Sequence, residues 1–284
     1  MIIDMRLRPV TESFLKSTTD IFPTYGCMFG YELPESVVRR SMELCCREMD
    51  EAGINLGMAE ARWSFAPQSD PIVPAEDVVD IVTRYPDRLK GAIAINGYHV
   101  QRAIADAETY VVNGPCTGLS LELPFGFSMN PELPINDKSL QPLFSYMQEQ
   151  DIPLFLTGGC IYGSQPVCCI DDMLKTFPRL RVFDLHGHVP YVNEIIHVAL
   201  THPNLYLCPD MYGINTHYTR PYVDAANGFL QDQIVFGSAY PFIPMKPAVE
   251  VYETYFKTST IRDKIMYQNA LRGLNMTEAD LRVL

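Results

Sequence analysis

The sequence lacks any uninterrupted run of about 18 apolar residues, the length that would suggest a transmembrane helix. Hydrophobic residues nevertheless make up 47% of the 284 residues, in short runs. The opening segment MIIDMRLRP also lacks a basic stretch followed by an apolar one, so we expect no secretory signal peptide. These absences argue against a membrane-spanning protein and leave the composition of an ordinary globular one.

Basic residues are scarce relative to acidic ones. The chain has 22 lysines and arginines against 34 aspartates and glutamates, a net charge of −12. Nucleic acids and anionic membrane surfaces are bound by basic faces, so we expect neither nucleic acid nor membrane among the partners. A local basic pocket inside this acidic protein would be more informative than the overall charge.

Cysteines are present, but without the spacing that zinc knuckles or disulfide frameworks require. The eight cysteines are scattered, form two adjacent pairs and include no CxxC motif. We therefore expect neither a zinc knuckle nor a disulfide framework. Reduced thiols are typical of the cytoplasm, which is the compartment that we predict.

Short apolar runs alternate with amphipathic stretches along the whole chain. The strand-like segments lie at 2–8, 54–61, 89–96, 117–123, 153–159, 181–188, 205–212 and 233–240. Helix-like segments between and after them lie near 35–52, 75–85, 99–113, 139–150, 167–177, 190–201, 218–228 and 247–256. Eight such repeats predict an α/β fold, a single (β/α)8 TIM barrel that spans residues 1–284 as one domain.

A doubly wound open sheet is the alternative arrangement of the same segments. Its nucleotide-binding form carries a GxGxxG motif or a P-loop after a strand, and neither motif follows a strand-like segment here. Barrels with flat outer helices often pack against further copies of themselves, so we expect a homo-oligomer of unspecified symmetry.

Enzymes with the barrel fold place their catalytic groups at the carboxyl ends of the strands. Three long irregular segments, 9–34, 62–74 and 124–138, follow strands and would lie at that mouth. The strand ends also carry more polar residues than a barrel can bury without partners. The candidates for substrate binding or catalysis are Arg6, Arg8, Arg62, Glu122, Thr157, His186, Asp210 and Tyr240.

Arg6 and Arg8 lie two residues apart, so in a strand they share one face. Guanidinium groups bind carboxylates and phosphates through paired hydrogen bonds, which favours an anion clamp for a carboxylated substrate. The alternative is a structural network in which both arginines pair with Glu60, Glu122 or Asp210.

His186 could transfer protons at neutral pH, because an unperturbed imidazole titrates near this range. The alternative is a buried imidazole that only completes hydrogen bonds. Glu122 and Asp210 are candidate bases or partners of the arginines, and the hydroxyl groups of Thr157 and Tyr240 could contact substrate.

A divalent metal ion is the less favoured interpretation of the same strand ends. The HxH pair of His186 and His188, together with Asp210, could supply the three protein ligands of a catalytic metal. The other strand ends offer few further residues of a suitable type, so we expect no metal cofactor.

Several segments resemble the amidohydrolase superfamily in order and spacing: IIDMRLRP, PLFLTGG, VFDLHGHVP with LCPDMY, and IVFGSAYPF with NALRGL. They are most similar to its amidohydrolase-related branch, which includes aminocarboxymuconate semialdehyde decarboxylase and γ-resorcylate decarboxylase. The resemblance covers most of the chain and is strongest over 150–275. It implies a TIM barrel in which His186 is the catalytic acid–base group.

The resemblance fails at the metal ligands of that family. Where the family has HxH at the end of its first strand, this chain has Arg6 and Arg8. Where the family has a histidine on its fifth strand and an aspartate on its eighth, this chain has Thr157 and Ala239. The resemblance therefore implies a barrel that has lost its divalent ion, with the arginine pair able to stabilise negative charge instead.

These observations predict a metal-independent hydrolase or carboxy-lyase for a small carboxylated metabolite, unsaturated or aromatic. In this hypothesis the arginine pair holds the anion and His186 moves the proton. Two alternatives remain open. One is a non-catalytic protein that binds acidic metabolites, and the other is an enzyme with a rebuilt metal site.

Overall fold

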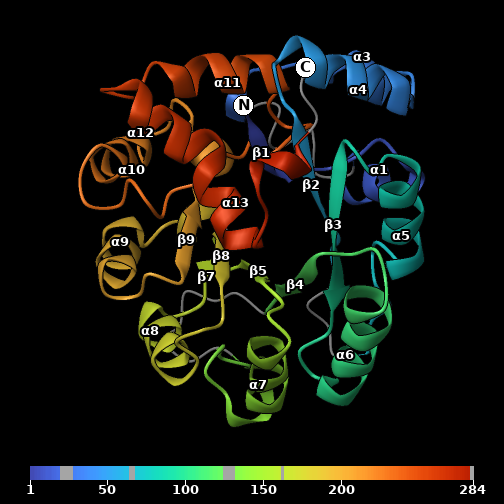
Figure 1. Cartoon of the computed structure of the whole chain (residues 1–284), viewed down its shortest axis with the longest axis vertical. Coiled ribbons are helices and arrows are strands. Elements are labelled where there is room, and N and C mark those ends of the chain that lie inside the picture. Colours follow the sequence, from blue (N-terminus) through green and yellow to red (C-terminus); the bar gives the residue numbers. More distant parts are fainter. Residues whose placement is uncertain (20–27, 64–67, 124–131, 161–162, 282–284) are drawn as a thin grey trace.

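The computed structural model describes residues 1–19, 28–63, 68–123, 132–160 and 163–281. Its main sheet has seven parallel strands that follow one another in chain order (Figure 1). They are β1 (Ile3–Leu7), β2 (Leu56–Glu60), β3 (Leu89–Ile95), β4 (Gly118–Glu122), β5 (Leu154–Thr157), β8 (Val182–Leu185) and β9 (Leu205–Cys208). A separate antiparallel pair consists of β6 (Gly159–Cys160) and β7 (Gly163–Ser164).

The eighth predicted strand, 233–240, links the two edges of this sheet without forming a regular strand itself. On one side, the amide of Val235 donates to the carbonyl of Leu207 in β9 at 3.0 Å. On the other side, the amide of Met5 in β1 donates to the carbonyl of Phe236 at 3.0 Å. The sheet therefore curls into a nearly closed barrel, which confirms the TIM-barrel prediction over the open sheet.

Helices surround the strands, as Figure 1 shows. They are α1 (Glu12–Thr19), α3 (Glu35–Val38), α4 (Met42–Glu51), α5 (Ala75–Arg84), α6 (Val100–Ala107), α7 (Gln141–Glu149), α8 (Val167–Thr176), α9 (Val192–Thr201), α10 (Thr219–Ala226), α11 (Met245–Glu253), α12 (Ser259–Asp263) and α13 (Asn269–Leu274). The predicted irregular segment 9–34 contains a helix, α1, so that part of the prediction was wrong. Residues 20–27, 64–67 and 124–131 of the predicted loops lie outside the described residues.

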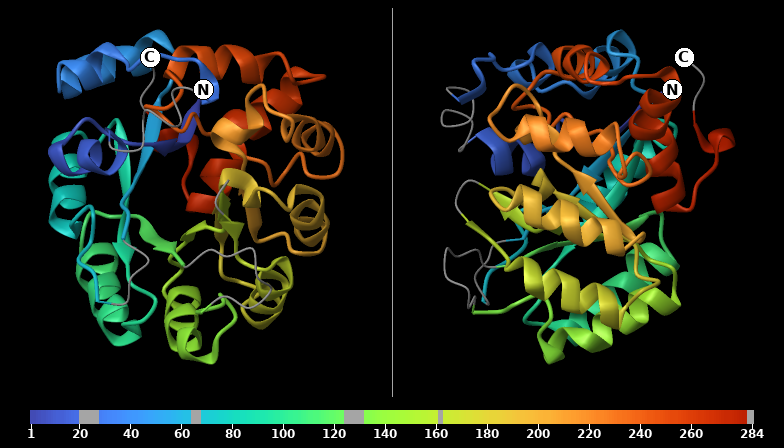
Figure 2. Two further views of the ribbon diagram at one scale, coloured as in Figure 1. Left: turned by 180° about the vertical axis from the view of Figure 1, so that it is seen from behind. Right: turned by 90° about the vertical axis from the view of Figure 1, so that its left-hand side faces the viewer.

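The barrel interior near the start of the strands is apolar. There α13 packs on a buried cluster that includes three stacked rings, and the right-hand view of Figure 2 shows α13, in red, at one end of the strands. The ring centroids of Phe155 and Phe183 are 5.1 Å apart, and those of Phe183 and Tyr206 are 5.0 Å apart. Gly273 of α13 packs so closely that a Cβ atom would come within 2.4 Å of Phe183. Apolar packing closes this end, which leaves the opposite mouth for a polar site.

None of the helices in the described ranges is both long and apolar enough to cross a membrane. No two of the seven cysteines in these ranges are joined by a disulfide, and Cys27 lies outside them. Four of the seven thiols are buried, where they pack as small apolar groups.

Candidate active site

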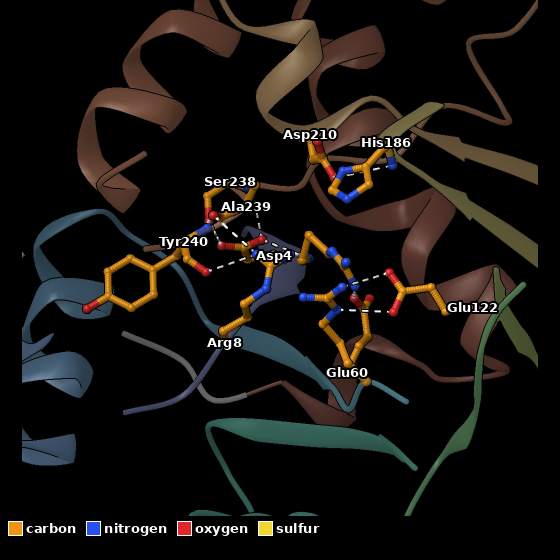
Figure 3. Close-up of polar contacts among 11 residues, drawn as sticks. Asp4, Arg8, Glu60, Glu122, His186, Asp210, Ser238, Ala239 and Tyr240 are labelled. Atoms are coloured by element: carbon orange, nitrogen blue, oxygen red, sulfur yellow. Dashed lines mark hydrogen bonds and ion pairs between the residues drawn. The ribbon is translucent and has the colours of Figure 1, made fainter. Parts of the chain in front are cut away.

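The carboxyl ends of the strands bring together a cluster of buried and half-buried polar side chains (Figure 3). Besides the strands, the turns η3 (His186–His188) and η4 (Asp210–Gly213) contribute to it, as does the closing segment 233–240. The members of this cluster are Asp4, Arg6, Arg8, Glu60, Arg62, Glu122, His186, Asp210 and Ser238. Buried charges need partners, so the contacts of each residue indicate whether it is committed to the fold or free for a ligand.

Asp4 joins β1 to the closing segment. Its carboxylate accepts hydrogen bonds from the amide of Arg6 at 3.0 Å and from the amide and hydroxyl of Ser238 at 2.9 and 2.5 Å. Burial raises the pKa of Asp4, and these hydrogen bonds oppose that shift. Both carboxylate oxygens are engaged, so Asp4 holds the barrel together at this point.

Arg6 pairs with Glu60, and their side chains are only 2% and 1% exposed. One terminal nitrogen of the guanidinium donates to one oxygen of Glu60. The other Glu60 oxygen and Nε of Arg6 have no hydrogen-bond partner among the described residues. Burial raises the pKa of Glu60 to about 7, although the charge of Arg6 opposes the shift. The pair therefore leaves two buried polar atoms that a ligand or a water molecule could engage.

Arg62 and Glu122 bind each other through two parallel hydrogen bonds. Nε of Arg62 donates to Oε2 of Glu122 and Nη2 donates to Oε1, both at 3.1 Å. The arginine side chain is 21% exposed and the glutamate 6%. Because both oxygens of Glu122 are occupied, this residue serves here as the partner of Arg62 rather than as a free base.

Arg8 differs from these two arginines in its partners. Its Nη1 atom donates to the carbonyl oxygens of Ala239 and Tyr240, both at 3.3 Å. Its Cζ atom lies 5.0 Å from the centroid of the Phe242 ring, a cation–π distance. Among the described residues no carboxylate forms an ion pair with Arg8, and its Nε atom has no hydrogen-bond partner.

The charge of Arg8 is therefore poorly compensated, although the residue is only 5% exposed. Burial lowers the pKa of Arg8 to about 9, and the positive charges of Arg6 and Arg62 add to the shift, whereas Asp210 and Glu60 oppose it. At neutral pH the guanidinium is still a cation, because this pKa lies well above 7. A buried cation without an anionic partner is costly, and an anionic ligand would supply the missing charge.

His186 and Asp210 meet across the turns η3 and η4. Nδ1 of His186 lies 2.7 Å from Oδ2 of Asp210, in a close contact that is not aligned as a full hydrogen bond. Burial lowers the pKa of His186, Asp210 opposes this, and the guanidinium groups of Arg6 and Arg8 lower it further. His186 is therefore neutral at pH 7. With a proton on Nδ1 facing Asp210, Nε2 would be the atom that accepts a proton.

The backbone adopts the left-handed conformation at four residues that lie at three of these strand ends. The angle φ is +62° at His186, +67° at His188, +44° at Asp210 and +58° at Ala239. None of these residues is glycine, so each position carries a strain of about 1–2 kcal/mol. This strain lies at backbone positions that set the directions of side chains in and beside the cluster, as it does at many functional sites.

His188 is committed to the fold. Nδ1 lies 2.7 Å from Oδ2 of Asp184, and Nε2 lies 2.8 Å from the carbonyl oxygen of Gln165. Burial works against the charged ring, but Asp184 outweighs it and raises the pKa of His188. The described part of the chain has no group of three His, Cys, Asp or Glu residues placed to hold a metal ion. The geometry therefore gives no support to a rebuilt site of His186, His188 and Asp210.

Replacing His188 by glutamine should lower the free energy of unfolding by about 2–4 kcal/mol, because Asp184 would lose its ring partner in a buried position. Urea denaturation of the two proteins measures the difference. His217 is exposed and provides the matched control, and His217→Gln should change the same free energy by less than about 0.5 kcal/mol. A His188→Gln protein as stable as the parent would contradict the structural role.

Two residues that were predicted to contact substrate, Tyr240 and Thr157, differ in where their side chains lie. The Tyr240 ring points away from His186 and Glu122 (Figure 3), and its hydroxyl hydrogen-bonds with Ser36 of α3 and, at 2.9 Å, with Glu48 of α4. The predicted contact of Tyr240 with substrate does not fit this position, because the hydroxyl forms its hydrogen bonds with the outer helices α3 and α4. Thr157 is buried at the end of β5, in register with Glu122 of β4.

Two residues of this region were not predicted, and neither was one contact of Tyr212. Asp4 and Asp184 each precede a predicted residue, Arg6 and His186, by two positions, so the alternation of side chains along a strand could have revealed them. Tyr212 meets the His186 ring edge-on, with centroids 5.3 Å apart. The sequence carries no signal for this contact, because it depends on how η3 and η4 pack together.

Comparison with known proteins agrees with this architecture. A family model described as Amidohydrolase matches residues 37–275. A search of curated protein sequences gave no match. Among solved structures, an uncharacterised TIM-barrel protein of Bordetella bronchiseptica is 33% identical, with a TM-score of 0.84 over 96% of this chain and 98% of that one.

Two further solved structures share the fold at low sequence identity. A dihydroxybenzoic acid decarboxylase from a Polaromonas species, with bound manganese and the inhibitor 2-nitroresorcinol, is 18% identical, with a TM-score of 0.72 and 99% of each chain covered. The 5-carboxyvanillate decarboxylase of Sphingomonas paucimobilis is 15% identical, with a TM-score of 0.62 over 97% of this chain and 99% of that one.

The manganese in the Polaromonas enzyme raises the question of whether this chain could hold such an ion. The resemblance assigns metal ligands to positions that here hold Arg6, Arg8, Thr157 and Ala239. Two of these are buried guanidinium groups, which repel a divalent cation, and a third has no ligand atom in its side chain. None of the four expected ligands remains, so these residues do not fit a divalent metal ion.

Proposed function

Since the chain belongs to the amidohydrolase family, we propose that it is an enzyme that hydrolyses or decarboxylates a small carboxylated molecule, unsaturated or aromatic, without a divalent metal ion. Two structural neighbours are, by their names, decarboxylases of dihydroxybenzoic acid and 5-carboxyvanillate, which supports an aromatic acid as the substrate class. The poor fit of the strand-end residues to a metal ion supports the metal-independent form of the reaction.

The proposal rests mainly on the uncompensated charge of Arg8. This guanidinium is buried, lacks a carboxylate partner among the described residues and remains a cation at neutral pH. A substrate carboxylate would form with it the ion pair that Arg6 and Arg62 already form with glutamates. The anion would then lie close to His186, whose pKa already responds to the charge of Arg8.

Proton transfer is assigned to His186, with Asp210 holding the ring. In hydrolysis, the neutral ring would take a proton from the attacking water molecule. In decarboxylation, the protonated ring would give its proton to the substrate carbon while the bond to the carboxyl group breaks and carbon dioxide leaves with the second product. The negative charge of the bound substrate raises the pKa of a neighbouring imidazole, which favours this proton-donating form.

Arg6 would stabilise the negative charge that develops on the substrate during either reaction. It is buried beside the same cluster, and its Nε atom still has a hydrogen bond to donate. Preorganised cationic donors of this kind act without a cost of reorganisation. Arg62 and Glu122, which bind each other, together with Thr157 would orient the substrate from the neighbouring strands.

A panel of acids with matched amides tests the anion site. We expect benzoate and related aromatic acids to raise the melting temperature, and benzamide to leave it unchanged, because only an anion can pair with Arg8. Mass spectrometry of the incubated mixtures then detects turnover. Binding without product from any acid would favour the non-catalytic alternative, and equal effects of acids and amides would contradict the anion site. A stoichiometric metal that is required for activity would overturn the metal-independent form.

A further inference from the structure

A second feature lies next to His186 and has no part in the proposed proton transfer. It is a cavity of about 460 Å³ between the segment around Phe29 and Tyr31 and the stretch that follows β9. This volume is within the range of about 300–1,000 Å³ that is typical of small-molecule sites. Its described walls include no Asp, Glu, Lys or Arg residue.

The walls of this cavity are largely aromatic, and Tyr212 is at the centre of them. The Tyr212 ring meets Phe29 edge-on with centroids 6.5 Å apart, and it meets Tyr218 edge-on at 6.4 Å. The ring of His217 lies against that of Tyr218, with centroids 3.8 Å apart. Aromatic walls that already pack edge-to-face offer the same favourable geometry to the ring of a ligand.

Tyr212 also connects the cavity to the candidate active site. The same ring that forms a cavity wall meets the His186 ring edge-on, with centroids 5.3 Å apart. Tyr212 is part of η4, two residues after Asp210, so the cavity and the His186–Asp210 contact share one short turn. The tyrosine is only 1% exposed, so its ring is packed between the cavity and His186.

Arg8 and the cavity differ in the charge of the groups that they can bind. Arg8 is a buried cation, which selects an anion. The described walls of the cavity offer aromatic rings, the apolar side chains of Met28 and Ile214, and the polar groups of Asn215 and Thr216, and none of them is a Lys or Arg that would pair with a carboxylate. An elongated molecule that passes the edge of the Tyr212 ring would engage both, with its aromatic end in the cavity, its acidic end at Arg8 and its middle next to His186.

We propose that this cavity is a binding site for the aromatic ring of an extended substrate, an aryl-substituted carboxylate whose acidic group lies at Arg8. The inference rests on the proposed function for the position of the carboxylate, whereas the affinity of the cavity for an aromatic ring does not depend on it. The cavity would then determine specificity for long aromatic acids over short acids.

A series of ω-phenylalkanoates with two to five methylene groups, each paired with the alkanoate of the same chain length, tests this inference by calorimetry. We expect at least one chain length at which the phenyl group tightens binding tenfold or more. Phe29→Ala should reduce that gain at least fivefold and leave the alkanoate unchanged. The control Phe229→Ala removes an aromatic side chain that is 76% exposed elsewhere, and it should change neither ligand.

The outcomes separate the two proposals. No gain from the phenyl group at any length, or a gain that Phe29→Ala leaves intact, overturns the cavity site. Arg8→Met should weaken the acids but not the uncharged 3-phenylpropan-1-ol, and acids that bind this variant normally would overturn the proposed anion site alone. If Phe29→Ala does not fold, a crystal of the unaltered protein with a 4-bromophenylalkanoate decides the question, because anomalous scattering should place bromine beside Phe29 and Tyr218. Bromine elsewhere would overturn the cavity site.

Discussion

Replacing His186 by asparagine is expected to lower kcat/KM at least about 100-fold while the affinity for carboxylates survives. Asparagine fills a similar space and can still face Asp210, but it neither accepts nor donates the catalytic proton. Arg8 is unchanged in this variant, so the anion site remains. Steady-state kinetics with an acid from the thermal-shift panel, together with calorimetry of the same acid, measures the two effects separately.

His197→Asn is the matched control, because His197 is an exposed histidine on α9 and its replacement should leave the rate unchanged. The pH profile gives an independent readout. Burial lowers the pKa of His186, so a base in the free enzyme would lose activity only as the pH falls through a value below the ordinary 6.5. A rate that rises as the pH falls through this value would instead identify the proton donor of a decarboxylase. Unchanged turnover in His186→Asn would refute both roles.

Replacing Arg8 by methionine is expected to stabilise the ligand-free protein and to abolish its response to carboxylates. The change removes a buried cation that has no carboxylate partner among the described residues, which should add about 1–3 kcal/mol to the free energy of unfolding. The two carbonyl groups that Arg8 contacts keep other donors, the amide of Phe242 for Ala239 and the amide of residue 8 for Tyr240. Thermal unfolding with and without benzoate measures both effects.

Arg88→Met is the matched control, since Arg88 is also a buried arginine but is paired with Asp50 and with the carbonyl of Ile54. We expect this control to lose stability and to keep the full response to benzoate. Opposite signs of the two changes in the free energy of unfolding would distinguish an arginine that binds a ligand from an arginine that stabilises the fold. An Arg8→Met protein that loses stability and still responds to benzoate would show that Arg8 is a structural residue.

The architecture could be predicted because its signals are local. Apolar runs of strand length alternate with amphipathic helices along the chain, and seven of the eight predicted strands form the sheet. The eighth, 233–240, reads like the others, but it closes the barrel through isolated hydrogen bonds. Its left-handed residue, Ala239, interrupts the regular strand, and alanine gives no sequence signal for that conformation. The homo-oligomer and the cytoplasmic location stay predictions.

The site could be predicted only as a set of candidates. Strand alternation placed Arg6 and Arg8 on one face, and the barrel fold placed them at the same mouth as His186. Tyr240 belonged to the same set of candidates, although its ring points away from the cluster and its hydroxyl hydrogen-bonds with Glu48 on α4. The direction of a side chain at an irregular strand end follows from backbone angles that the residue types do not specify.

The sequence by itself determined the barrel, the family resemblance and the presence of three arginines at strand ends, because these depend on periodicity and on residue identity. Only the tertiary structure decided which arginine has an anionic partner. Glu60 lies 54 residues from Arg6, and Glu122 lies 60 residues from Arg62. Any of the strand-end carboxylates could have formed an ion pair with Arg8, since ion pairing does not depend on the separation of two residues along the chain. Packing placed none of the described carboxylates at ion-pair distance from Arg8, although Asp210 and Glu60 still act on its charge. This is the physical reason that Arg8 is the residue expected to bind a ligand.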